Sequence, residues 1–254
     1  MKLEDKKINS VPELIASVYT DVKDLKKPIW YRGLTNVDWK LVPSIFRGSN
    51  DSEKRLEINL IKKFKQDATL LMNPLPNENY AWLFVMRHHG VPTRLLDWTE
   101  SPLVAAYFSV IGDDKEKDGV VWALSPLELN NQEPRKLDDQ NNLPTFSEDT
   151  EMVAYTPESY SQEKMSTLLP IAFIAPRNTQ RMRSQLSTFV IYHRDKTPLE
   201  EIGDRKHIWR YIIPSSAKER IKKELEAIGI GKFQLFPELE SLGEILRVNI
   251  NGSN

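Results

Sequence analysis

The chain has 254 residues, of which 40% are hydrophobic and 28% are charged, and its formal net charge is −1 at pH 7. This length and apolar content allow a sizeable buried core, while the balanced charge excludes a global basic field for nucleic acid or for an anionic membrane. Because the sequence has no cysteine, no signal peptide and no apolar run long enough to span a bilayer, we exclude thiol chemistry and a membrane partner and expect a soluble, cytoplasmic protein.

The first half of the chain mainly has the patterns of helices. Ser10, with Glu13 three residues on, is a typical helix start. Pro28 and the aromatic run that follows it predict a short strand with a tight turn at Gly33. We further predict a helix from Asp51-Ser52 with Leu56, Leu60, Phe64, Ala68 and Leu71 as its apolar face, a helix that Asn79 caps and Gly90 ends in the left-handed conformation, and a helix from Ser101-Pro102 to Gly112.

The second half has the patterns of strands. Residues 119–124 and the later runs LLPIAFIAP, STFVIYH and IWRYIIP are short and rich in β-branched or aromatic residues. Residues 130–162 are polar and predict a long loop with short turns, which is uncommon unless the loop is mobile or functional. A last helix is predicted from the capping box of Ser216 and Glu219 to Gly229 or Gly231.

These patterns predict the fold class α+β. Helices dominate the first half and strands the second, without the strand–helix alternation of a parallel doubly wound sheet. We therefore expect helices in the N-terminal half and a mostly antiparallel sheet in the C-terminal half. No linker rich in Pro, Gly or Ser divides the chain, so residues 1–254 are expected to form a single domain.

Familiar catalytic motifs are absent from the sequence. We find no GxxxxGK[ST] loop, no GxGxxG after a strand, no HExxH and no GxSxG. His88 and His89 are consecutive and would point about 100° apart on a helix, so they do not share a metal as an i, i+4 pair does. His193 and His207 lie far away in the sequence. We therefore predict no metal site.

The stretch RHHGVPTRLLDWTESPLVAAYFS, residues 87–109, combines many ionisable side chains with apolar ones. His88 is a candidate general acid or base, or else a structural histidine. Thr99 and Ser101 stand at a helix start, where free N–H groups favour anions, although Ser101 is more simply an N-cap than a nucleophile. Arg94 and Asp97 face one another if the piece is helical and need not if it is extended.

Two further arginine segments are candidates for binding phosphate. Arg32 ends an apolar strand, and its guanidinium suits bidentate binding of phosphate or carboxylate. The alternative is that Arg32 pairs with Asp97 and pins two segments together. Arg177, Arg181 and Arg183 precede a strand, either as a phosphate-facing loop beside the same pocket or as an ordinary solvated turn.

Several segments together resemble the FRG domain family. Tyr31-Arg32-Gly33 resembles the signature that gives the family its name, and the resemblance extends from about residue 28 to residue 246, after an N-terminal helical extension over residues 1–27. Arg87, Leu186-Ser187, Glu238 and Glu240 depart from the residues usual in the family. The other matching segments are LVPSIFRG, which ends at Gly48, HHGVPTRLLDWT with Ser101-Pro102 and Ala105-Ala106-Tyr107-Phe108, the set Arg181, Gln185 and Phe189, and the run FPELE at residues 236–240.

The resemblance implies that the charged positions form one constellation. Its predicted catalytic residues are Arg32, His88, Arg94, Asp97 and Gln185. The resemblance also implies a bacterial or phage-associated protein, of a toxin or phage-defence kind, but little chemistry. The residues predicted to bind a nucleotide or NAD are Arg32, Thr99, Ser101 and Arg181.

A more distant analogy is with ADP-ribosyltransferase-like folds. These place an arginine on an early strand, then a Ser/Thr-containing segment leading into a helix, and a glutamate on a late strand. Arg32 and the run from Trp98 to Ser101 are similar to the first two parts. Ser187 stands where the late carboxylate would be, so Asp97, Glu100 or Glu238 would have to stabilise an oxocarbenium ion instead.

Three hypotheses of function follow. The first is an enzyme acting on a nucleotide or on NAD as substrate, in which Arg32 and Arg94 clamp phosphate, His88 transfers a proton and Asp97 orients a partner or stabilises a cation. The second is a non-catalytic module that binds a nucleotide, an RNA end or a protein. The third is a purely structural ion-pair cluster. Convergence of Arg32, His88, Arg94 and Gln185 on one cleft would favour the first two.

Overall fold

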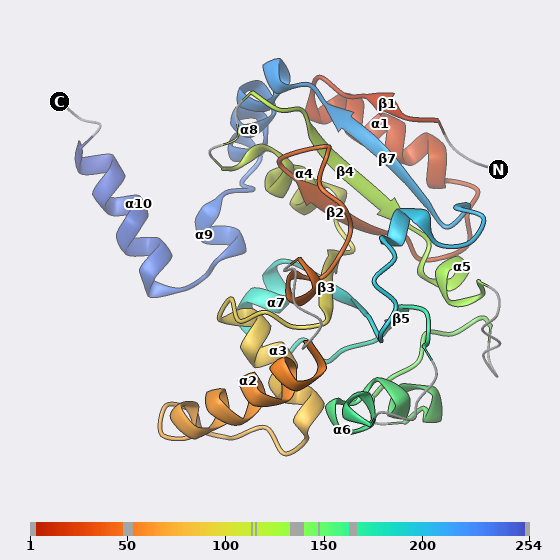
Figure 1. The fold of residues 1–254 in the computed structure, drawn as a ribbon. Helices are drawn as coiled ribbons and strands as arrows, with labels where there is room; N and C mark the ends of the chain where they lie inside the picture. The colour runs from red at the N-terminus through yellow and green to blue at the C-terminus, as the bar shows by residue number, and fades with distance from the viewer. Residues whose placement is uncertain are drawn as a thin grey trace.

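The structure is a computed structural model that describes residues 4–47, 53–112, 114, 116–132, 140–146, 148–162 and 167–251. The predicted positions Gly48 and Asp51-Ser52 lie outside these residues. In the described chain, seven strands form one sheet in the order β1-β7-β4-β2-β3-β6-β5 (Figure 1). The strands are β1 Lys6–Lys7, β2 Trp30–Leu34, β3 Leu95–Thr99, β4 Gly119–Leu124, β5 Ile171–Phe173, β6 Ser187–Ile191 and β7 Ile208–Ile213.

The α+β class is confirmed, and the sheet is antiparallel except where β1 runs parallel to β7. The predicted division between a helical first half and a sheet second half holds only in part, because β2 and β3 occupy the middle of the sheet. β3 is not predicted from the sequence, because its side chains are buried on both faces of the sheet. Apolar and polar residues therefore do not alternate along this strand.

The helices cover the sheet in two groups. α1, α4 and α8 pack on one face of β2, β4 and β7, while α2 and α3 pack against β3, β5 and β6. Figure 1 shows the second group below the sheet and α10 apart from it at the edge of the molecule. The helices are α1 Val11–Val22, α2 Glu53–Ala68, α3 Asn79–His88, α4 Pro102–Val110, α5 Pro126–Asn130, α6 Pro157–Ser161, α7 Gln180–Ser184, α8 Lys218–Ala227, α9 Lys232–Leu235 and α10 Leu239–Asn251.

Three of the predicted helix ends are confirmed. The Ser10 hydroxyl accepts from the backbone N–H of Glu13, and the Ser101 hydroxyl accepts from that of Val104, each at 3.3 Å. Gly90 has φ +76° and ends α3. The N–H groups of Gly90 and Val91 bond the carbonyls of Arg87 and Met86, which is the Schellman pattern of a left-handed helix end. The chain therefore turns sharply just after His88.

Two predicted caps are wrong. Asn79 is the first residue of α3 rather than its cap, and no side chain caps that helix. Ser216 and Glu219 do not form a capping box, because a 3₁₀ turn at Ser215–Ala217 precedes α8 and leaves Ala217 at the cap position. A backbone turn there replaces the side-chain cap.

The predicted loop over residues 130–162 contains more structure than its polarity suggests. A 3₁₀ helix at Thr150–Tyr155 and α6 follow one another within it. The side chains of Met152, Tyr155 and Tyr160 are buried. These large side chains anchor the otherwise polar segment to the hydrophobic core. Residues 133–139 and 147 lie outside the described chain.

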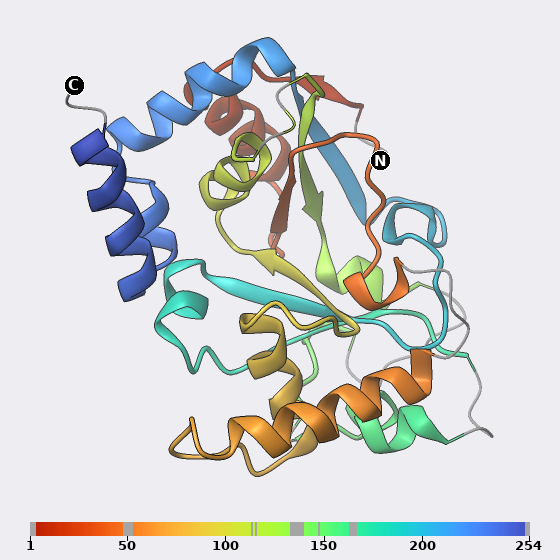
Figure 2. The ribbon, with the colours of Figure 1, turned by 60° about the vertical axis from the view of Figure 1, so that its left-hand side comes forward.

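The sheet consists of two parts that diverge at a narrow junction. β2 pairs with β4 along its whole length, and β3 does so with β6. In contrast, the only residue pair between β2 and β3 in the described chain is Tyr31 with Thr99. Figure 2 shows β3 and β6 running diagonally to β2 and β4. The middle of the sheet is therefore open beyond this one pair.

Gly33 allows α4 to lie directly on β2. A Cβ atom at Gly33 would lie 1.8 Å from the backbone oxygen of Ala105, and one at Gly119 would lie 2.4 Å from that of Ser109. Backbone atoms of a packed helix do not move aside easily. The glycine of Tyr31-Arg32-Gly33 is thus required by the close approach of a helix to the strand.

We expect Gly33→Ala to destabilise the protein by about 3 kcal/mol or more, because overpacking against backbone cannot relax. The matched control is Gly231→Ala, since a Cβ atom at Gly231 would meet nothing within 4 Å. The free energy of unfolding in urea measures both. A Gly33→Ala protein within about 0.5 kcal/mol of the wild type would contradict the packing argument.

Candidate functional site

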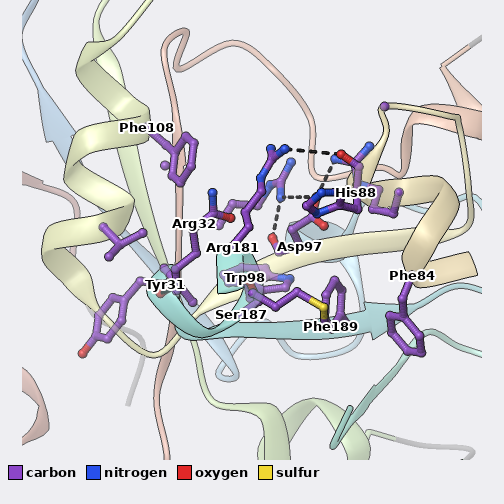
Figure 3. Close-up of a pocket in the computed structure, with 17 residues that line it drawn as sticks. Tyr31, Arg32, Phe84, His88, Asp97, Trp98, Phe108, Arg181, Ser187 and Phe189 are labelled. Carbon is purple, nitrogen blue, oxygen red and sulfur yellow. Dashed lines mark hydrogen bonds and ion pairs between the residues drawn. The ribbon is translucent and has the colours of Figure 1, made fainter. Parts of the chain in front are cut away.

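A cavity of about 440 Å³ lies where the two parts of the sheet diverge. It takes residues from β2, β3 and β6 and from helices α3, α4 and α7. Figure 3 shows Arg32, Asp97, His88 and Arg181 pointing into the same space, with Phe108 on one side and Phe189 on the other. The lining residues are Tyr31, Arg32, Gly33, Phe84, Arg87, His88, Gly90, Asp97, Trp98, Thr99, Val104, Phe108, Arg181, Met182, Gln185, Ser187 and Phe189.

Asp97 is held by two arginines from different elements. Arg87, in the last turn of α3, donates to Asp97 Oδ2 through Nε at 2.8 Å and also through Nη2. Arg32 Nη1, from β2, donates to the backbone oxygen of Asp97 and lies 3.8 Å from Oδ2. The Arg32 side chain thus bonds β3 just where the backbone pairing between β2 and β3 has stopped.

The charges of this cluster support one another. Burial would raise the pKa of the Asp97 carboxyl, but Arg87 and then Arg32 outweigh burial and hold the pKa below its usual value. Burial lowers the pKa of Arg32 to about 10, against the opposing effect of Asp97. Asp97 is therefore a carboxylate, and Arg32 a cation, at neutral pH. A carboxylate so firmly ionised is a poor general base.

Arg181 reaches the cavity from α7 and is held loosely. Its Nη1 donates to the backbone oxygen of His88 at 3.3 Å, and its guanidinium carbon lies 4.5 Å from the ring centroid of Phe236. Stacking on an aromatic face holds the position of an arginine without using its N–H groups. Within the described residues Nη1 makes the one protein hydrogen bond of this side chain, so other N–H groups are available to a ligand.

His88 is the last residue of α3 and faces a carboxylate across the cavity rim. Its Nε2 lies 3.4 Å from Glu238 Oε1. Burial, then Arg181 and His89, lower the pKa of His88, although Glu238 opposes them. His88 is therefore a neutral imidazole at pH 7, able to accept or donate a hydrogen bond.

The remaining wall is aromatic and carries unused donors. Phe84, Trp98, Phe108 and Phe189 line it. In the described part of the chain, the buried Arg32 Nε and Trp98 Nε1 have no hydrogen-bond partner. Buried N–H groups without partners cost free energy unless a ligand or a water pairs with them. The cavity thus combines unused donors with flat apolar surfaces.

Thr99 and Gln185 line the cavity but bond the protein as well. The Thr99 hydroxyl donates to the backbone oxygen of Gln185 at 2.6 Å, and Gln185 Nε2 donates to the backbone oxygen of Leu235 at 3.0 Å. Ser101 does not line the cavity, since its hydroxyl caps α4. Thr99 and Gln185 therefore tie β3, α7 and α9 together around the cavity.

Arg94 lies away from the cavity, in a separate buried site. Its side chain and that of Glu57 are both 0% exposed, and Arg94 Nε lies 2.7 Å from Glu57 Oε2. Its other nitrogens donate to the backbone oxygens of Tyr155 and Tyr192, each at 2.8 Å, and its guanidinium stacks 3.9 Å from the ring centroid of Tyr160. Here Arg94 connects α2, the 150–162 segment and the sheet.

The separation of Arg94 from Asp97 follows from strand geometry. Side chains three apart on an extended chain point to opposite faces of a sheet. The structure thus brings Arg32, His88, Asp97, Gln185, Thr99 and Arg181 together and leaves out Arg94 and Ser101.

Sequence patterns predict no contacts for four residues in or beside these two sites. Arg87 is identified from the sequence only as a departure from the family motif. Phe236 and Glu238 belong to the matching run FPELE, and Glu238 is also a candidate carboxylate for an oxocarbenium ion, but neither is predicted to meet Arg181 or His88. The burial of Glu57 is not predicted because the buried face of α2 differs from the predicted apolar face. Leu56 and Leu71 are exposed, whereas Glu57 and Ile61 are buried. A charged residue four positions before a buried isoleucine was the signal available for Glu57.

Comparison with family models matches residues 27–118 to the FRG domain. The chain therefore contains an FRG domain. Neither the comparison with curated proteins nor that with solved structures found a match. The matched residues include Arg32, Arg87, His88, Asp97 and Thr99. The α7 segment, which lines the cavity, and the segment around Glu238, which contacts His88 beside it, lie beyond them.

The described residues contain no helix long and apolar enough to cross a bilayer. They also contain no cluster of three or more His, Asp or Glu side chains placed to hold a metal ion.

The lowered pKa of Asp97 predicts a specific dependence of stability on pH. A carboxyl whose folded-state pKa is depressed stabilises the fold above its ordinary pKa, and this contribution is lost as the pH falls. We expect the melting temperature of the wild type to fall more steeply than that of Asp97→Asn between about pH 5 and about pH 3. Asp97→Asn is expected to melt lower at pH 7, because Arg87 loses its carboxylate.

The control is Asp38→Asn, which removes an exposed carboxylate paired with Lys117. An exposed pair of this kind contributes little to stability. Parallel curves of melting temperature against pH for the wild type and Asp97→Asn would rule out the linkage.

Proposed function

We propose that the cavity binds a phosphate-bearing ligand of nucleotide type, with NAD as one candidate. The observation that carries the proposal is the balance of charge. Among the described lining residues, Arg32, Arg87 and Arg181 face a single carboxylate, that of Asp97. Arg87 is committed to Asp97, so the positive charges of Arg32 and Arg181 are the ones left to attract an anion.

The free donors support phosphate in particular. The fork of a guanidinium matches two phosphate oxygens, and such charge-assisted bonds are stronger than neutral ones. Arg32 Nε is buried without a partner, and Arg181 keeps N–H groups unused within the described residues. A group rich in acceptor oxygens would pair with both.

The apolar wall supports a flat ring attached to that phosphate. Stacking of a base on an aromatic side chain contributes about 1–3 kcal/mol per base. Trp98, Phe108 and Phe189 line the cavity beside the arginines, and Phe108 is the one of these rings that is only partly buried. A volume of about 440 Å³ lies in the range of pockets that hold small organic ligands.

We expect Arg181→Ala to weaken binding of ADP by about 10- to 100-fold, because it removes charge-assisted hydrogen bonds to phosphate. Isothermal titration calorimetry measures the affinity. Arg183→Ala is the matched control, since Arg183 is an exposed arginine on the same helix that does not line the cavity. An equal loss in both variants, or no nucleotide bound by the wild type at millimolar concentration, would reject the proposal.

A second candidate function is catalysis on an NAD-like substrate. The neutral His88 on the cavity wall favours it, because an imidazole that is neutral at pH 7 can accept a proton from a bound substrate and return it. In this mechanism Arg32 holds phosphate and His88 transfers the proton. An ADP-ribosyltransferase mechanism would need another carboxylate at the ribose, because β6 offers Ser187 and Asp97 is held by Arg87.

Incubation of the protein with labelled NAD tests this second candidate. We expect His88→Gln to slow turnover by about 100-fold or more, as loss of a general acid or base does, with NAD affinity nearly unchanged. If the wild type binds NAD and turns none over, alone or with protein and RNA acceptors, the cavity is a binding module without chemistry.

The setting of this function is also a proposal. We propose a cytoplasmic protein of bacterial or phage-associated origin, in a toxin or phage-defence system that acts on RNA or on another protein. The resemblance of the motifs to the FRG family and the absence of cysteine support it.

A further inference from the structure

The segment from Leu235 to Glu238 contacts several residues that line the cavity. The backbone oxygen of Leu235 accepts from Gln185, and the ring of Phe236 carries Arg181 on its face. The Phe236 ring also meets Phe108 edge-on, with centroids 5.9 Å apart. Each of these contacts is made to a residue that lines the cavity.

Glu238 brings a negative charge close to Arg181, one of the two cations that would attract an anion, and to the neutral His88. Its Oε1 lies 3.4 Å from His88 Nε2, and Glu238 is the carboxylate with the largest electrostatic effect on Arg181. That oxygen is buried and makes no hydrogen bond within the described residues. Oε1 of Glu238 thus lacks a hydrogen-bond donor where it lies. The negative charge of Glu238 would repel an incoming phosphate.

The attachment of this segment is uneven. Leu235 is 3% exposed and belongs to the core under α4 and α8. Pro237 follows Phe236, and the backbone N–H of Glu238 bonds the Phe236 oxygen, which forms a tight turn. Beyond the turn, α10 mainly contacts α9, and its Leu239, Leu242 and Leu246 are exposed. Movement beyond Phe236 would therefore disturb little of the core.

We propose that Glu238 is an internal competitor for the anion site: its carboxylate meets His88 and interacts electrostatically with Arg181, and a phosphate-bearing ligand displaces it by moving the chain beyond Phe236. This inference rests on the proposed binding function. In this proposal Glu238 has a regulatory role. Its negative charge offsets part of the electrostatic attraction that the arginines exert on a phosphate. Leu235 and its bond to Gln185 stay in place during the displacement.

Titration calorimetry with ADP tests the proposal on the full chain. We expect Glu238→Gln, which removes the charge and keeps the shape, to bind ADP about 5- to 20-fold more tightly than the wild type. Glu240→Gln is the matched control, since Glu240 is an exposed carboxylate two residues on, and it is expected to bind ADP as the wild type does. Adding Arg181→Ala to Glu238→Gln should remove the gain.

The other outcomes separate the inference from the proposed function. Equal affinity of the wild type and Glu238→Gln would overturn the competition and leave the binding site intact. Weaker binding by Glu238→Gln would overturn it too, and would make the carboxylate an acceptor for ligand hydroxyls. Absence of ADP binding in the wild type and in Glu238→Gln alike would reject both the function and the competition.

Hydrogen exchange of the full chain tests the displacement itself. We expect saturating ADP to speed exchange of backbone amides in residues 238–247 of the wild type, while exchange in β2 and β3 slows. The exposed α8 end around Ile228 serves as an internal reference. Unchanged or slower exchange over residues 238–247 with bound ADP would overturn the displacement.

Discussion

The bond from Arg32 to the backbone oxygen of Asp97 is the interaction on which the rest of the site depends. β2 and β3 pair through their backbones only at Tyr31 and Thr99 in the described chain, and beyond that pair a side chain takes over from the backbone. The hydrogen bond of the Arg32 side chain thus joins the two parts of the sheet and leaves a space between their strands. The cavity exists because the strands diverge, and it is cationic because an arginine joins them.

Arg94 differs from the cavity arginines Arg32 and Arg181 in how its hydrogen-bond donors are used. Arg94 is entirely buried with Glu57, and each of its three guanidinium nitrogens donates to a carboxylate or to a backbone carbonyl. A buried pair of this kind organises a region, since the loss of either partner would strand a charge in the core. Arg32 and Arg181 keep donors unused. Burial and the number of satisfied bonds distinguish a structural arginine from one able to bind a ligand.

The cavity also depends on segments from the far end of the chain. The FRG match ends at residue 118, yet α7 supplies Arg181, and the segment after α9 supplies Phe236 and Glu238 around the same space. The matched region provides β2, α3 and β3, which hold Asp97 and its two arginines. The later region provides Arg181, the more loosely held cation, and the carboxylate of Glu238 beside His88. The charged groups in and beside the cavity therefore come from both regions of the chain.

Local chemistry alone determined several features of this protein. The cap at Ser10, the left-handed end of α3 at Gly90 and the start of α4 at Ser101 depend on neighbouring residues, so the sequence predicted them. The resemblance to the FRG family, rather than local chemistry, grouped Arg32, His88, Arg94, Asp97 and Gln185, of which all but Arg94 line the cavity. Only the tertiary structure decided that Arg94 turns away to Glu57, that Arg87 holds Asp97, and that Glu238 meets His88. These contacts join residues 10 to 150 positions apart, and their geometry depends on strand faces and helix packing that no local pattern records.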